Sequence, residues 1–172
     1  WEILYRLINR CNEVIKYAPN AQGDATTLAR YANEAKALRA FGYYELVTTF
    51  GGVPLLTEPM APSQVLATPR ASADEVWTQI ISDCTDAEAL PAKGQYSADE
   101  QYHVTRGFAK AMLAKTYMFR QDYANAEKVL HEIIEVDHDY ALLPDYGLNW
   151  TPAYENSSES VFEIPNKMDP NN

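Results

Sequence analysis

The stretch ANEAKALRAFGYYELVTTFGGVPLL, residues 32–56, decides the fold of this chain. Its first half consists of strong helix formers, and apolar residues lie on nearly every side of the helix that they predict. A helix that is apolar all round is buried inside a protein. Gly51 and Gly52 permit backbone conformations that other residues resist, and Pro54 cannot continue a helix. The sequence therefore predicts a central helix, at about Thr26–Phe50, that ends abruptly.

Apolar residues recur at helical spacing in four further segments, each of which predicts a helix. These segments cover about Glu2–Tyr17, Ser72 to just before Pro91, Thr105–Gln121 and Tyr123–Val136. Short turns make neighbouring helices antiparallel. The tract after Pro54 is expected to be a long irregular loop that wraps the surface or carries a function, with the wrap as the default. SVFEI, Ser160–Ile164, predicts a short strand.

The last two predicted helices follow the pattern of a tetratricopeptide repeat (TPR). Leu113, Ala114 and Tyr117 match the first-helix positions, and Ala126 matches the small packing position of the second helix. His138 departs from the pattern, because proline is usual there. The predicted fold class is all-α: a TPR-like helical-repeat bundle of antiparallel helix pairs with long irregular loops and a short C-terminal strand.

The composition excludes several classes of partner. The chain has 172 residues, with 14 basic and 24 acidic side chains and a formal charge of −10. Because nucleic-acid affinity rests on neutralising phosphates, an acidic chain without a basic stripe predicts no nucleic-acid partner and no docking on anionic lipid. Cys11 and Cys84 occupy apolar helical positions and are expected to be buried free thiols, with a disulfide as the alternative. His103, His131 and His138 have no metal-binding spacing, and no cofactor is predicted.

Residues 34–55 closely resemble the signature helix and turn of the SusD/RagB family. The matching residues are Glu34, Ala35, Leu38, Arg39, Ala40, Tyr44, Leu46, Phe50, Gly51, Gly52, Val53, Pro54 and Leu55. Five other blocks resemble the family in the same order: LYRLINRCNEVI, EVWTQIISDCTDAEALP, VTRGFAKAMLAKTYM, YALLPDYGLNW and SSESVFEI. Thr105 and Gly107 fit the family's pattern before the fourth helix, whereas the Gly-Arg pair that often precedes them is absent. The resemblance covers almost the whole chain.

The resemblance implies a function that periodicity alone does not show. Relatives are lipid-anchored proteins on the outer-membrane surface of Bacteroidetes. They capture glycans, or sometimes peptides, and pass them to a SusC-like TonB-dependent transporter without performing chemistry. Residues 1–172 would form a single helical lobe of a longer chain, with the lipid anchor outside this segment. An exposed apolar surface is expected where the rest of such a protein would pack.

Four aromatic side chains in predicted loops are candidate ligand contacts: Tyr96, Tyr102, Trp150 and Tyr154. Sugar rings have apolar faces that stack on Trp and Tyr, while their hydroxyls take side-chain hydrogen bonds. The alternative is that Tyr96 and Tyr102 cover the adjoining helices and that Trp150 packs in place of a phenylalanine.

Two other functions are weighed against glycan capture. A TPR-type scaffold would bind only protein, as many helical repeats do. An all-helical glycosidase would need paired carboxylates, and Asp83 with Asp86 or Asp137 with Asp139 supply the spacing. Carboxylates at that spacing are expected to be ordinary surface residues of an acidic protein, so catalysis is not predicted.

Overall fold

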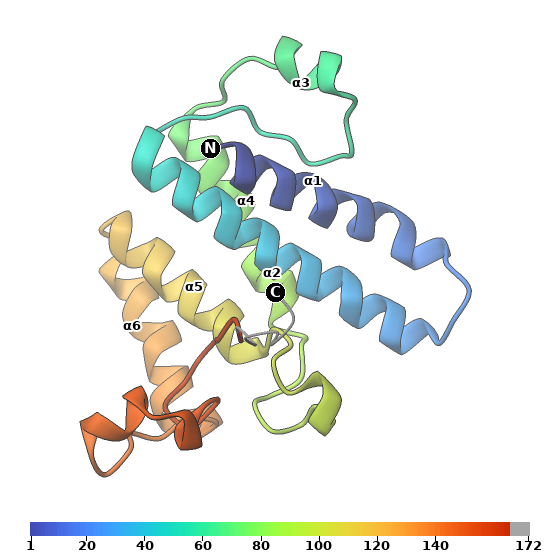
Figure 1. Ribbon diagram of the computed structural model, residues 1–172. Coiled ribbons are helices and arrows are strands. Elements are labelled where there is room, and N and C mark those ends of the chain that lie inside the picture. Colours follow the sequence, from blue (N-terminus) through green and yellow to red (C-terminus); the bar gives the residue numbers. More distant parts are fainter. Residues whose placement is uncertain (166–172) are drawn as a thin grey trace.

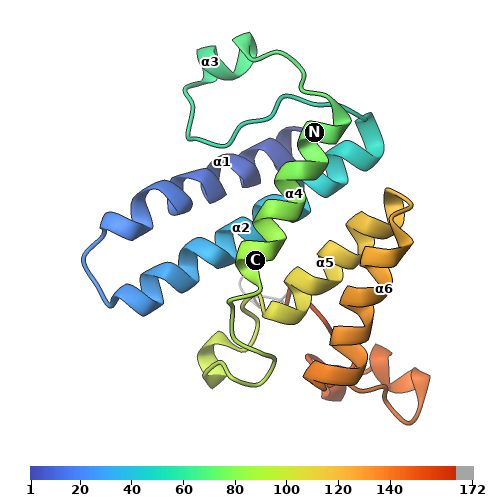
Figure 2. The same cartoon turned by 180° about the vertical axis from the view of Figure 1, so that it is seen from behind.

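The computed structural model describes residues 1–165 as a stack of α-helices (Figure 1). The helices are α1 (Glu2–Tyr17), α2 (Ala25–Phe50), α3 (Pro62–Ala67), α4 (Ala73–Ala87), α5 (Arg106–Phe119) and α6 (Tyr123–His131). A π-helical turn (Glu132–Asp137) continues α6, and 3-10 turns lie at Ala18–Asn20, Ala98–Glu100, Tyr146–Trp150 and Pro152–Tyr154. Figures 1 and 2 show α1 antiparallel to α2 and α5 antiparallel to α6, with α4 crossing α2. The predicted all-α, TPR-like fold is confirmed.

The helix ends follow from local sequence. Asp24, Thr105 and Asp122 accept hydrogen bonds from backbone amides at the starts of α2, α5 and α6. Ser72 caps α4, and the Glu75 side chain bonds back to it, which completes a capping box. Gly51 ends α2 with a φ of 69°, a value that glycine adopts without strain.

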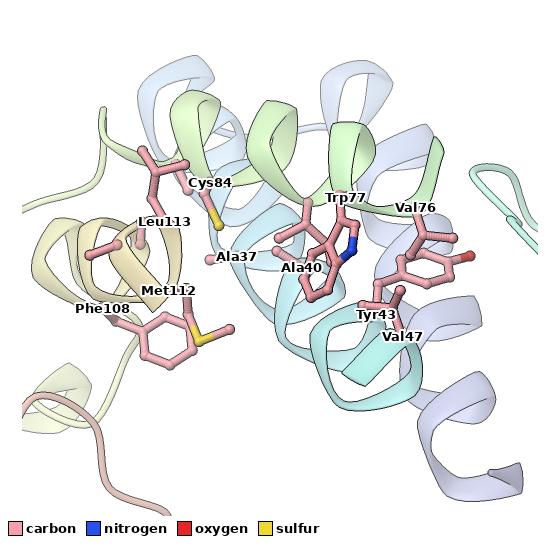
Figure 3. Packing of buried hydrophobic residues seen from close by; sticks show 14 of the residues in the cluster. Ala37, Ala40, Tyr43, Val47, Val76, Trp77, Cys84, Phe108, Met112 and Leu113 are labelled. Carbon is pink, nitrogen blue, oxygen red and sulfur yellow. The ribbon is translucent and has the colours of Figure 1, made fainter. Parts of the chain in front are cut away.

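The core forms around α2. Small residues of α2, among them Ala37 and Ala40, are fully buried and let its neighbours approach closely. Figure 3 shows Trp77 of α4 beside Ala40 and Tyr43, with Met112 of α5 on the far side of Ala37. The aromatic and aliphatic side chains of three helices therefore meet over a narrow, alanine-rich surface of α2.

A buried ion pair links α2 to α4. The Arg39 guanidinium donates to both carboxylate oxygens of Asp83, at 2.8 and 2.7 Å, and to Oδ1 of Asn12 at 2.8 Å. The expectation that Asp83 is a surface residue is wrong, because its side chain is only 2% exposed. Asp86 does lie at the surface, where it pairs with Lys36 at 2.8 Å.

Asp137 and Asp139 are also not surface residues. Their side chains are 11% and 10% exposed, and they pair with cations of α5. Lys110 Nζ lies 2.7 Å from Asp137, and Arg106 Nε lies 2.8 Å from Asp139. These pairs hold the chain that follows α6 against the start of α5.

The long tract between α2 and α4 wraps the helices in its first part. Val53 and Leu56 are buried, and the Tyr43 hydroxyl donates to the Leu56 carbonyl at 2.8 Å. Asn12 Nδ2 donates to the same carbonyl at 2.9 Å, so this part of the tract is tied to both α1 and α2. The second part contains α3, which was not predicted and which stands away from α1 in both views (Figures 1 and 2).

The strand predicted at Ser160–Ile164 does not form. These residues are irregular, and the described part of the chain offers no strand to pair with them. Side-chain packing takes its place: the Phe162 ring lies 4.7 Å from that of Phe108, centroid to centroid. Residues 166–172 of the predicted lobe lie outside the described residues.

The structure also bears on the two cysteines, on the expected exposed apolar surface and on the length of the helices. Cys11 and Cys84 are free and buried, so the disulfide alternative is wrong. Apolar side chains are exposed along α5, α6 and the π-helical turn that follows, including Met118, Tyr123 and Ile134. Among residues 1–165, no helix is both long and apolar enough to cross a bilayer.

Candidate functional site

A cavity of about 240 Å³ lies between two segments that are distant in sequence. One wall is the connecting loop, residues 93–105, between α4 and α5. The other wall is the strap, residues 156–163. The lining side chains mix aromatic and polar character, and they include Lys93, Tyr96, Gln101, Tyr102, His103, Asn156, Phe162 and Glu163.

Hydrogen bonds hold the strap against the loop. Lys93 Nζ donates to Asn156 Oδ1 at 2.6 Å and to the Ser160 carbonyl at 2.7 Å. Asn156 in turn donates through Nδ2 to the Gln101 carbonyl at 3.0 Å and through its backbone amide to Glu163 Oε2 at 2.9 Å. Burial lowers the pKa of Lys93, and Glu163 opposes this shift. The cavity therefore has a fixed polar floor.

Tyr96 presents its ring but not its hydroxyl. The hydroxyl donates to the Val104 carbonyl at 2.7 Å, and Glu34 Oε1 lies 3.2 Å away. The Arg30 guanidinium lies 5.1 Å from the ring centroid, within cation–π distance. Burial raises the pKa of Tyr96, so the hydroxyl stays protonated. This residue is a rigid apolar wall.

Three polar groups around the cavity keep hydrogen-bonding capacity. The Tyr102 hydroxyl and Glu163 Oε1 have no partner among the described residues. His103 uses Nδ1 on Glu34 Oε2, at 2.9 Å, which leaves Nε2. Tyr102, Glu163 and His103 therefore supply a hydroxyl, a carboxylate oxygen and a ring nitrogen to a molecule in the cavity.

The four predicted aromatic contacts divide into two groups. Tyr96 and Tyr102 line the cavity together. Trp150 is 75% exposed and packs edge-on against Tyr146, with ring centroids 6.1 Å apart. Tyr154, which is 39% exposed, also lies outside the cavity. Trp150 and Tyr154 are thus candidates for a separate, open stacking surface.

The sequence reasoning missed Lys93, Asn156 and Glu163. No local motif marks them, since the loop and the strap are about sixty residues apart and meet only in the folded chain. Within residues 1–165 no three His, Cys, Asp or Glu side chains come together to hold a metal ion. A small cavity with aromatic walls and a few directed polar groups suits a hydroxylated ring.

The sequence matches the SusD-like_3 family, described as starch-binding and associating with the outer membrane, over residues 1–118. SusD-like protein P38 of Formosa agariphila is 33% identical over 135 residues, which are 78% of this chain and 25% of that protein. SusD-like protein P25 of the same organism is 26% identical over 169 residues, which are 95% of this chain and 31% of that protein.

Solved structures share the fold. A laminarin-binding SusD-like protein superposes with a TM-score of 0.87 at 34% identity, over 94% of this chain and 36% of the other. Surface glycan-binding protein A from Bacteroides thetaiotaomicron, in complex with laminarihexaose, gives a TM-score of 0.79 at 25% identity, over 94% of this chain and 34% of the other. This chain thus spans between a quarter and about a third of the length of these relatives.

Proposed function

Because this chain belongs to the SusD-like family of starch-binding proteins that associate with the outer membrane, we propose that it serves in glycan capture at the cell surface. The whole protein would bind an oligosaccharide, or a peptide in some members, and deliver it to a SusC-like TonB-dependent transporter. A lipid anchor outside this segment would hold it to the outer membrane. Its role is binding, without catalysis.

One observation carries this proposal: the 34%-identical protein of the same fold binds laminarin. The cavity supports the proposal, since Tyr96 and Tyr102 supply rings and Glu163 supplies an acceptor. Stacked α-helices suit contact with a protein partner such as the transporter, because helical repeats present extended surfaces.

Binding is tested with the purified protein and laminarihexaose in a titration calorimeter. We expect saturable binding with the sugar recovered intact. Tyr102→Ala should weaken it about tenfold, because it removes a ring and a hydroxyl from the cavity wall. Tyr17→Ala is the matched control, since Tyr17 is 60% exposed at the end of α1, and it should leave the affinity unchanged.

Three results would argue against the proposal in different ways. Full affinity in Tyr102→Ala would exclude this cavity as the binding site. Release of shorter sugars would contradict a binding-only role. A failure to bind any of a panel of glycans, together with copurification of an outer-membrane barrel, would favour the scaffold alternative.

A further inference from the structure

The charges around the cavity bear on which glycans it accepts. Two cations lie close to it, Lys93 and Arg30, and of these two Arg30 is the one paired with carboxylates. Arg30 donates to Glu100 through two nitrogens and lies 3.7 Å from a Glu34 oxygen. Lys93 uses two of its three ammonium protons on the strap.

In the described part of the chain, three carboxylates (Glu163, Glu34 and Glu100) and two cations lie around the cavity, so these charges sum to a net negative value. Glu163 lines the cavity, and its Oε2 accepts from the Asn156 amide while Oε1 has no partner in the described chain. Glu34 and Glu100 lie behind Tyr96 and His103 and outnumber the guanidinium between them. The formal charge of −10 on the whole chain adds a repulsive field for anions at longer range.

We infer that the cavity takes an uncharged sugar ring and discriminates against rings that carry a carboxylate or sulfate. This inference rests on the proposed glycan-binding function and narrows its ligand class. A neutral ring donates hydroxyls to Glu163 Oε1 and to His103 Nε2, while its apolar face lies on an aromatic wall. An anionic ring would place its charge near Glu163, and Lys93, the lining cation that is not paired with a carboxylate, already donates two of its protons to the strap.

The volume supports one ring at a time. Sites for drug-sized ligands hold roughly 300–1,000 Å³. A cavity of about 240 Å³ is smaller, so it suits a single sugar unit, such as a chain end or a branch.

The test compares two ligands that differ at C6, where one carries a neutral hydroxymethyl group and the other a carboxylate. Laminarihexaose and its C6-carboxylated derivative are titrated into the purified protein at low ionic strength. We expect the neutral hexaose to bind at least tenfold more tightly, with a gap that narrows as salt is added because screening weakens the repulsion. The affinity of the neutral hexaose should change less than about twofold over the same salt range.

The variant Glu163→Gln tests whether Glu163 causes the discrimination between the neutral and the carboxylated hexaose. The amide keeps a carbonyl oxygen for the Asn156 N–H but carries no charge. The ratio of the two affinities should fall about fivefold or more. Glu155→Gln, an exposed position just before the strap that does not line the cavity, should leave the ratio unchanged.

The outcomes separate the inference from the function on which it rests. Equal or tighter binding of the carboxylated hexaose would overturn the inference and leave glycan capture intact, as would an unchanged ratio in Glu163→Gln. Absence of saturable binding by either hexaose and by a panel of other neutral oligosaccharides would overturn the proposed function itself.

Discussion

Arg39 fixes the mutual positions of α1, α2 and α4. Its guanidinium reaches Asp83, Asn12 and the Thr57 carbonyl, and its side chain is 6% exposed. Taking two charges out of water is costly, so such a pair contributes less to net stability than its short distances suggest. Its specific geometry disfavours other packings of the same helices, because any shift would leave a charge buried without a partner.

Removing one partner of the Arg39–Asp83 pair should strongly destabilise the protein. Arg39→Met leaves Asp83 buried beside only Gln79, and we expect the free energy of unfolding to fall by about 3–5 kcal/mol. Urea denaturation followed by far-UV circular dichroism measures the loss.

Lys36→Met is the matched control, because Lys36 pairs with Asp86 between the same two helices but at the surface. Its cost should be below about 1 kcal/mol. Equal costs for the two variants would show that burial of the Arg39 pair does not matter.

The residues that sequence reasoning placed well are those whose environment is set locally. The helical character of α2, the start of α4 at Ser72 and the break at Gly51 depend on neighbours in the chain, and each was predicted. The burial of Asp83 depends on Arg39, 44 residues away. A carboxylate on a predicted helix is expected at the surface unless a cation that pairs with it, distant in the sequence, is known.

The same distinction applies to the candidate site. Tyr96 and Tyr102, which line the cavity, could be named as candidates because aromatic residues in a polar loop are conspicuous in sequence. Asn156 and Glu163 could not, since their roles arise only where the strap meets the loop. The predicted strand was wrong for a related reason: an alternating pattern gives no information about whether a pairing partner exists.

At the scale of elements, the start of α5 is pressed against the chain that leaves α6. A Cβ atom on Gly107 would overlap the Tyr140 hydroxyl and ring, so glycine is required there for close approach. Tyr140 also shares a hydrogen bond of 2.9 Å with Thr105, the N-cap of α5.

Gly107→Ala should destabilise the protein by about 1–3 kcal/mol, because Tyr140 must move out of its site. In a Tyr140→Ala background the overlap is gone, and the same substitution should become neutral or stabilising by up to about 1 kcal/mol, since alanine is the better helix former. Thermal unfolding of the wild type, the two single variants and the double variant measures both values. A destabilisation of equal size in both backgrounds would contradict the overlap.

At the scale of the whole molecule, the main helices pack mostly on their neighbours along the chain. The extensive contacts join α1 with α2, α2 with α4, α4 with α5, and α5 with α6. In such an array, stability approximates a sum of element and nearest-neighbour interface contributions. Local weakening near one end should therefore stay near that end.

Val129 of α6 offers a test, because its side chain is 8% exposed and belongs to the core. Val129→Ala should lower the free energy of unfolding by about 1–3 kcal/mol. Amide hydrogen exchange should then show reduced protection in α5 and α6, with α1 and α2 nearly unaffected. Val47→Ala in the central α2 should lower protection throughout, and uniform loss in both variants would indicate one cooperative unit instead.

The excursion that carries α3 is anchored at its root. Ala71 N donates to the Val53 carbonyl at 3.0 Å, and Arg70 donates to the Gly52 and Phe50 carbonyls at 2.7 and 2.8 Å. The chain between these points closes on itself beside the end of α2, and Leu66 at its tip is 89% exposed. Loop length adds little to the entropy of closure, roughly 0.6 kcal/mol for each doubling. The excursion is thus a point where one segment can be exchanged for another of different length while the helices beneath it stay as they are.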